Sequence, residues 1–123
     1  MSLPPDRRRY PRFQVPGATV SYKLHGFSHR PFDEICPVLN LSKGGLGFQT
    51  NRQVKPGQQL TLILTSKAAP IHLQAQVVYC KPHPVMGHPY HVGVAFAPFG
   101  AGTGLNSHEA LEALDQLEKT YAN

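Results

Sequence analysis

A cluster of arginines lies near the N-terminus, in the run RRRYPR from residue 7 to residue 12. A guanidinium group presents a planar fork of N–H donors that fits a phosphate, and its flat face stacks on aromatic rings. Arg8 and Arg12 are four residues apart, so a turn at Tyr10 and Pro11 would let them hold one ligand from two sides. The same run also fits a solvated basic tail or a non-specific nucleic-acid arm.

Small polar residues and glycines form a second cluster, in the run NLSKGG from residue 40 to residue 45. Asn40 offers a carbonyl acceptor and an amide donor that complement the edge of a guanine, and Ser42 adds a short hydroxyl. Gly45 has no β-carbon, so a flat ring or a phosphate could approach the backbone there. These residue types are also common in ordinary hairpin turns, so the run alone does not define a site.

The charges are distributed unevenly along the 123 residues, which carry a net charge of +5. Four of the 12 basic residues lie in the first run, and no carboxylate occurs between Ile35 and His108. A hard metal ion needs several carboxylate oxygens, and general acid–base catalysis often uses a carboxylate pair. Ser42 also lacks the Gly-x-Ser-x-Gly surroundings of a hydrolase nucleophile. We therefore expect an anionic partner, no cofactor and no enzymatic activity.

Histidines and cysteines are the remaining candidates for a metal site. His83, His88 and His91 surround one expected loop, and Cys80 is near them in the sequence. Their spacing fits no standard zinc pattern, so we expect no metal. Cys36 and Cys80 both lie in apolar, strand-like runs, which indicates reduced thiols in the core.

Six short apolar or alternating runs predict β-strands, separated by segments rich in proline and glycine. The expected strands span residues 18–24, 34–40, 46–50, 59–65, 71–80 and 90–96. Alternation in the fifth run places five residues on one face, namely Ile71, Leu73, Ala75, Val77 and Tyr79. Residues 81–89 are expected to form a loop. Short antiparallel strands at this spacing predict a mainly β protein, a small closed barrel or a sandwich.

The C-terminal segment predicts one α-helix. Its apolar residues recur at helical spacing, at Leu111, Leu114, Leu117 and Tyr121. Asn106 is expected to cap the helix, with Glu109 at the capping-box position. We expect the apolar stripe to pack against the barrel, and a dimer or partner surface is the alternative.

These elements predict one domain with three parts: a flexible basic arm at 1–13, a barrel at 14–97, and a hinge and helix at 98–123. The N-terminal residues contain no apolar signal core, and no apolar run approaches membrane-spanning length. We therefore expect a cytoplasmic protein without a membrane partner.

The two runs together resemble the motifs of the PilZ domain family, which are receptors for the bacterial messenger cyclic di-GMP. Arg8 and Arg12 match the family's Arg-x-x-x-Arg motif. Asn40, Ser42 and Gly45 match its second motif, in the variant Asn-x-Ser-x-x-Gly.

The resemblance covers roughly residues 7–97, because the run GVAF at 93–96 is also similar to the family's closing strand. It implies a six-stranded antiparallel β-barrel with a C-terminal α-helix, and an arm that folds over the ligand. In the family, the two arginines hold phosphate and guanine, and the second motif receives a guanine. Arg7 directly precedes the first motif, and an arginine there tends to favour two intercalated ligand molecules.

We therefore expect a stand-alone cyclic di-GMP receptor that orders its N-terminal arm on binding and signals to a protein effector. We expect two ligand molecules per chain. The expected ligand-binding residues are Arg7, Arg8, Arg12, Asn40, Ser42 and Gly45. The alternatives are a small barrel that binds RNA or DNA through the basic arm, and a protein-interaction adaptor with a weak or lost ligand site.

Overall fold

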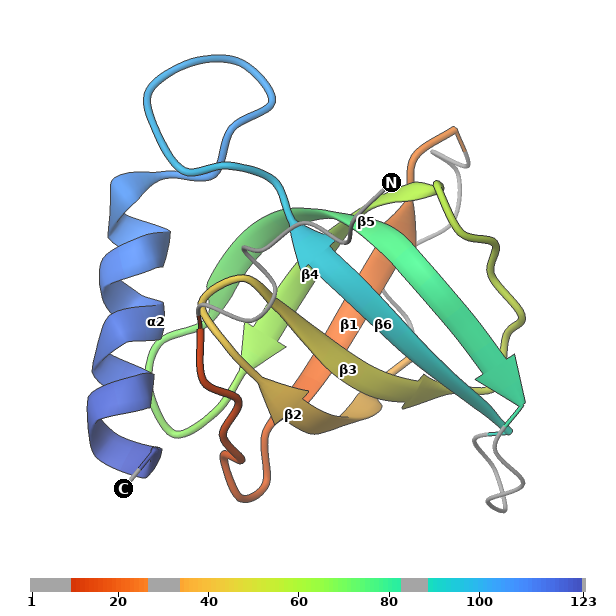
Figure 1. Cartoon of the computed structure of the whole chain (residues 1–123), viewed down its shortest axis with the longest axis horizontal. Helices are drawn as coiled ribbons and strands as arrows, with labels where there is room; N and C mark the ends of the chain where they lie inside the picture. The colour runs from red at the N-terminus through yellow and green to blue at the C-terminus, as the bar shows by residue number, and fades with distance from the viewer. Residues whose placement is uncertain (1–9, 27–33, 83–88, 123) are drawn as a thin grey trace.

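The computed structural model describes residues 10–26, 34–82 and 89–122. These residues form a closed antiparallel barrel in the order β1-β2-β3-β6-β5-β4 (Figure 1). The strands are β1 (Thr19–Leu24), β2 (Cys36–Leu41), β3 (Gly45–Thr50), β4 (Gln59–Thr65), β5 (Ile71–Pro82) and β6 (Tyr90–Phe96), and the helix that follows is α2 (His108–Tyr121). The predicted fold class, a small six-stranded barrel with a C-terminal helix, is confirmed.

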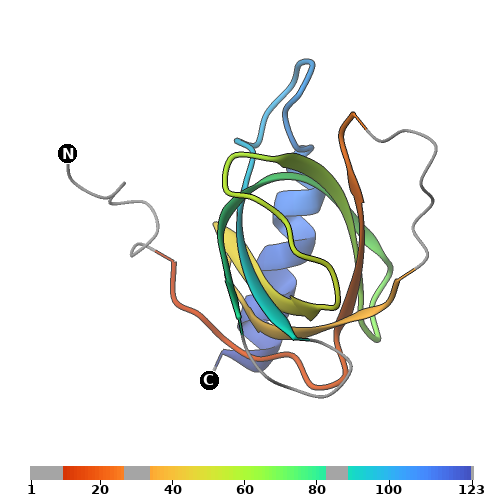
Figure 2. The same cartoon turned by 90° about the vertical axis from the view of Figure 1, so that its right-hand side faces the viewer.

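Apolar side chains from every strand fill the barrel. The fully buried ones include Val20, Leu41, Phe48, Leu62, Leu73 and Val92. Helix α2 lies across one end of the barrel, behind the ring of strands in Figure 2. Its side chains Ala110, Leu114 and Leu117 are buried in the same core, and Tyr121 packs against it. The apolar stripe of the helix therefore packs on the barrel, as predicted.

The N-terminal segment joins the barrel at Phe13. The amide of Phe13 donates to the carbonyl of Leu41 over 2.8 Å, and the amide of Leu41 donates back over 2.9 Å. The Phe13 side chain is buried in the core. Phe13, which we had included in the expected arm, thus forms part of the folded barrel, next to the second motif.

Two register shifts interrupt the alternation of side chains along the strands. In the pairing of β2 with β3, Val38 lies opposite Phe48 but Asn40 lies opposite Gly47. Residues two apart on a regular strand share a face, and a bulge reverses this relation. Val38 therefore packs against the core, whereas Asn40 points outward. The bulge is the local feature that exposes Asn40.

A second register shift occurs between Val77 and Tyr79 in the pairing of β5 with β6. Val77 is buried in the core, and Cys80 also packs against it. Tyr79 lies on the outer surface, where it lines a hollow together with Arg12. The prediction that Tyr79 lies on the same face of the strand as Val77 was wrong, because strict alternation does not account for a bulge.

Two further predictions about local structure were wrong. Strand β5 continues to Pro82, since Lys81 pairs with His91 and Pro82 pairs with Tyr90. Residues 81 and 82, which we expected in a loop, therefore belong to the strand. The N-cap of α2 is Ser107, whose hydroxyl accepts the amide of Ala110 over 3.1 Å.

Asn106, the N-cap that we predicted, has a different role. It is 3% exposed, and its side-chain oxygen accepts the amide of Gln74 over 2.6 Å. Its amide nitrogen donates to the carbonyls of Gln74 and Ala97, at 3.0 and 2.9 Å. Asn106 thus pins the start of the helical segment to β5 and to the end of β6.

Both cysteines are free thiols, and Cys36 is fully buried. Burial, with a smaller contribution from the nearby Glu34 carboxylate, raises the pKa of the Cys36 thiol to about 12. A thiol with that pKa stays protonated and unreactive at neutral pH.

Among residues 10–26, 34–82 and 89–122, no helix has the length and apolar character that a membrane span requires.

Candidate functional site

The two sequence motifs meet at a hydrogen bond. Nη1 of Arg12 donates to Oδ1 of Asn40 over 2.7 Å, on the exposed surface of the barrel. The pairing of Phe13 with Leu41 brings Arg12 to this position, and the bulge in β2 turns Asn40 toward it. The guanidinium group has five N–H donors, so this bond leaves donors for an anionic ligand.

The loop between β2 and β3 is held by its own polar groups. The amide of Ser42 donates to the carbonyl of Gly45 over 2.9 Å, and the Ser42 hydroxyl accepts the amide of Gly44 over 3.1 Å. The same hydroxyl donates to the carbonyl of Gly45 over 3.3 Å. Ser42 is only 6% exposed. Its first role is therefore to fix the shape of the loop.

Gly45 is required by the barrel itself. A β-carbon on Gly45 would collide with the backbone carbonyl oxygen of Val94 on β6. Gly45 pairs with Ala95 at the start of β3, so any side chain there would push the two strands apart. The close approach that we predicted exists, but the group that approaches is the neighbouring strand.

Four residues on neighbouring strands form a row across the outside of the barrel. Asn40 on β2 lies opposite Gly47 on β3, Gly47 lies opposite Gly93 on β6, and Gly93 lies opposite Tyr79 on β5. Strand spacing is about 4.8 Å, so at most about 14 Å separates the two ends of the row. Figure 1 shows these four strands side by side. The row places one side of the site on β2 and the other on β5.

Side chains lie directly on the two glycines of this row. A β-carbon on Gly93 would collide with the ring of Tyr79, and one on Gly47 would lie 3.1 Å from Nε2 of His91. Tyr79 and His91 are hydrogen-bonded, with 3.2 Å between the tyrosine oxygen and Nε2. The glycines therefore let a single layer of polar and aromatic side chains lie flat on the sheet.

A hollow at this face lies between the two motifs and the aromatic layer. Its lining includes Arg12, Ser42, Gly44, Gly45 and Tyr79. Its volume is about 20 Å³, room for about one water molecule and far too little for a nucleotide. A larger ligand at this face must therefore lie on the outside of the layer or displace the exposed side chains that line the hollow.

Tyr10 covers the loop from the N-terminal side. A β-carbon on Gly44 would lie 2.9 Å from Cδ2 of Tyr10, so the absence of a side chain allows the ring to sit on the loop. Nζ of Lys43 lies 5.8 Å from the centre of the same ring, within range of a cation–π contact. The start of the N-terminal arm thus rests on the second motif.

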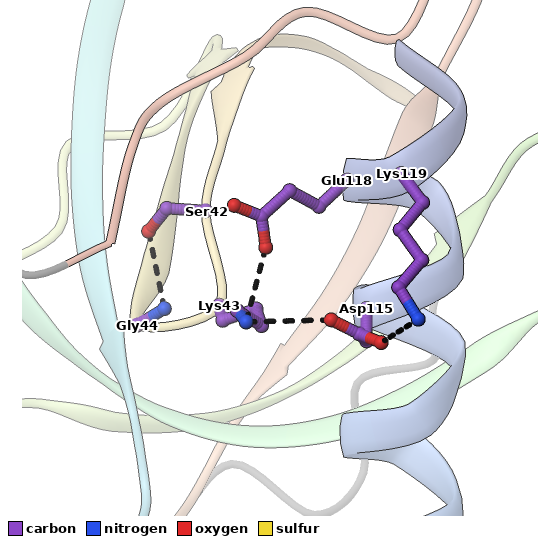
Figure 3. Close-up of polar contacts among 6 residues, drawn as sticks. All are labelled: Ser42, Lys43, Gly44, Asp115, Glu118 and Lys119. Atoms are coloured by element: carbon purple, nitrogen blue, oxygen red, sulfur yellow. Dashed lines mark hydrogen bonds and ion pairs between the residues drawn. The ribbon is translucent and has the colours of Figure 1, made fainter. Parts of the chain in front are cut away.

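Lys43 connects the loop to helix α2 (Figure 3). Its Nζ lies 3.1 Å from Oε1 of Glu118 and 3.4 Å from Oδ1 of Asp115, and Asp115 also pairs with Lys119 at 3.1 Å. The hydrogen bond to Glu118 is the main cause that raises the pKa of Lys43. Lys119, and then Lys43, hold the pKa of Asp115 below its usual value.

The structure brings together four of the six predicted ligand residues, Arg12, Asn40, Ser42 and Gly45. Arg7 and Arg8 lie outside the described residues. Ligand binding by all six stays a prediction. Sequence reasoning missed Tyr10, Lys43, Gly47, Tyr79, His91 and Gly93 as parts of this face. The glycines at 47 and 93, each inside an apolar strand, were the signal that could have indicated a close approach.

The histidines and cysteines that the sequence offers as metal ligands are not gathered in one place in the described part of the chain. Among the described residues, no group of three or more His, Cys, Asp or Glu side chains could hold a metal ion. His83 and His88 lie outside those residues. His91 contributes to the aromatic layer through its contact with Tyr79.

The protein is a small closed barrel, and a hydrogen bond between Arg12 and Asn40 joins its two sequence motifs. A match to the PilZ domain family spans residues 6–113, most of the chain. The chain therefore belongs to the PilZ domain family, as the motifs predicted.

A solved structure with the same fold is that of the Bacillus subtilis inhibitor of motility, MotI/DgrA. The TM-score is 0.65 at 17% sequence identity, and the alignment covers 90% of this chain and 48% of that one. The chain thus spans about half the length of that protein. No curated protein matches the sequence.

Proposed function

We propose that the chain is a receptor that binds cyclic di-GMP at the face described above. The observation that carries the proposal is the 2.7 Å bond from Arg12 to Asn40, which joins one residue from each family motif. Binding and not catalysis is the proposed activity.

The chemistry of the face suits a ligand with phosphates and guanines. The unused donors of Arg12 can meet a phosphate, and the Asn40 oxygen has a second lone pair for a guanine N–H. The loop at 42–45 is fixed before the ligand arrives, which reduces the entropy lost on binding. Arg8 and Arg7 are proposed to join Arg12 when the arm closes.

The proposed response is closure of the segment before Phe13. Phe13 is anchored in the core, and Tyr10 rests on Gly44. Bonds from Arg7 and Arg8 to the ligand would exist only in the closed arrangement, so they would supply the free energy that favours it. The closed arm changes the surface offered to a protein effector. The effector and a cytoplasmic location are part of the proposal.

Calorimetric titration with cyclic di-GMP tests this function directly. We expect a dissociation constant of about 1 μM or tighter, with much weaker binding of GTP. Binding of any polyanion with a steep salt dependence would favour the nucleic-acid alternative. A folded protein that binds neither cyclic di-GMP nor nucleic acid would overturn the proposal and favour the adaptor.

The same titration tests the number of ligands. A second ligand brings two more phosphates, whose charges repel the first pair unless further cations are close. Arg7 is the proposed additional cation, so we expect two molecules per chain. Arg7→Leu should shift the ratio toward one and keep binding. Saturation of the unmodified protein at one ligand would remove the role of Arg7 and leave the receptor standing.

A further inference from the structure

Tyr79 is held in a fixed position opposite the arginine–asparagine pair. The register shift after Val77 turns it outward, and it lines the same hollow as Arg12. Its ring lies on Gly93, where any side chain would collide with it. Its hydroxyl is bonded to His91 over 3.2 Å. A ring fixed at its base and at its hydroxyl loses little entropy when another flat ring stacks on it.

A cation lies beside the same ring. Nζ of Lys81 is 4.8 Å from the centre of the Tyr79 ring, close enough for a cation–π contact. Lys81 is exposed near the end of β5, so its long side chain can leave the ring at small cost. An arriving base would take its place on the ring, and the displaced ammonium group would be next to the phosphate of the same ligand.

We propose that Tyr79 is a base-stacking residue of the ligand site, and that Lys81 is a cation for the phosphate bound there. The inference rests on the proposed function and extends its site from β2 and β3 to β5. In this proposal, the two ends of the row from Asn40 to Tyr79 contact two different parts of the ligand. Arg12 and Asn40 hold one end, and Tyr79 with Lys81 holds the other.

The physical alternative is that Tyr79 only fills space over Gly93. Three variants separate these roles. Tyr79→Leu keeps apolar bulk over the glycine but has no flat face, whereas Tyr79→Phe keeps the ring and loses the bond to His91. Tyr90→Leu is the matched control, because Tyr90 lies on β6 three residues from Gly93, outside the row, and pairs with Pro82 at the end of β5.

Titration of each variant with cyclic di-GMP gives the test. Stacking of a base on an aromatic side chain predicts that Tyr79→Leu binds about 5- to 100-fold more weakly. Tyr79→Phe and Tyr90→Leu should stay within about twofold of the unmodified protein. Thermal unfolding of each variant is the control that tests whether the barrel is intact. A folded Tyr79→Leu variant that binds normally would overturn the stacking role.

The role of Lys81 is tested by Lys81→Met, with Lys67→Met as the control. Lys67 is an exposed lysine in the turn between β4 and β5. Lys81→Met should weaken binding about threefold and lower its salt dependence, since one phosphate contact is lost. Equal behaviour of the two variants would remove Lys81 from the site. If the unmodified protein does not bind cyclic di-GMP, the proposed function fails with the inference. If it binds and Tyr79→Leu binds equally well, only the inference fails.

Discussion

Two faces of the barrel differ in how their strands pair. On the face of β1, β4 and β5, the register of β1 with β4 and of β4 with β5 runs without a shift. Its outward side chains bond to one another, as in the contact of Thr61 with Gln74 at 3.1 Å and with His25 at 2.9 Å. This regular face is covered by polar side chains, as is usual for a solvent-facing sheet.

The face of β2, β3, β6 and β5 has a register shift at each side and glycines between them. The shifts expose Asn40 and Tyr79, and the glycines at 47 and 93 leave room for their side chains and for His91. A bulge disrupts the hydrogen-bond ladder locally, and a glycine inside a strand weakens it. The departures from regular structure are therefore concentrated where the two family motifs meet.

The largest effect is expected from adding a side chain to the irregular face. Gly45→Val should lower the free energy of unfolding by about 3 kcal/mol, because its β-carbon collides with the Val94 carbonyl. Ser21→Val places the same valine side chain on the regular face and should change the free energy of unfolding by less than about 1 kcal/mol. Denaturant unfolding measures both. Equal effects would show that the irregular face has no special need for glycine.

This expectation also changes how Gly45 can be used as a probe. The sequence predicts that a flat ring or a phosphate approaches the backbone at Gly45, where a valine side chain would block it. Since the collision is with the protein's own backbone, loss of binding in that variant would report a damaged barrel and not a blocked ligand.

The next effect concerns the arginines. Charge-assisted hydrogen bonds contribute about 1.5–3 kcal/mol each, so Arg12→Ala or Arg8→Ala should weaken cyclic di-GMP binding about 10- to 100-fold. The barrel should stay folded, because the Arg12 side chain is exposed. Lys67→Ala removes one positive charge from the turn between β4 and β5 and should have little effect. Titration that shows the same affinity for Arg12→Ala and Lys67→Ala would exclude a direct role of Arg12.

Much of the fold was predictable, because it depends on features that a sequence states directly. The alternation of Ile71, Leu73, Ala75 and Val77 predicts their burial, and the spacing of Leu114 and Leu117 predicts the buried side of α2. The number of strands followed from turn residues between such runs.

The site was predictable only through its motifs. The bulge that turns Tyr79 outward depends on how β5 pairs with β6, and no residue in β5 marks it. The exchange of roles between Asn106 and Ser107 has a similar cause, since both can cap a helix and tertiary bonds to Gln74 and Ala97 occupy Asn106. The contact of Lys43 with Glu118 joins residues far apart in the chain.

A smaller effect on ligand binding is expected from a change where the N-terminal arm contacts the loop between β2 and β3. Gly44→Ala adds a β-carbon 2.9 Å from the Tyr10 ring, so the ring must move. We expect about three- to tenfold weaker binding of cyclic di-GMP, since the arm loses a contact that favours its closed position. Gly100→Ala, outside the strands, is the control.

Hydrogen exchange locates the change in the Gly44→Ala variant. Amides of residues 6–12 should exchange quickly in the free protein and become protected by ligand, less so in the variant. The Phe13 amide should be protected in both, because it donates to Leu41. Strong protection of residues 6–12 without ligand would mean that the arm is closed beforehand.

The smallest effect is expected from the ion pairs that join the loop to α2. Lys119 and Lys43 lower the pKa of Asp115, so its charged form is favoured in the folded protein. The stability that this supplies is present above the ordinary carboxyl pKa of 3.8 and is lost as the pH falls through the lowered pKa. Asp115→Asn should therefore lower the Tm slightly at pH 7, and the two melting curves should converge in acid. At 1 M salt the Debye screening length is about 3 Å, so the difference in Tm between the two proteins at pH 7 should also shrink. A difference that persists at low pH and in high salt would mean that Asp115 acts through packing on α2 and not through its charge.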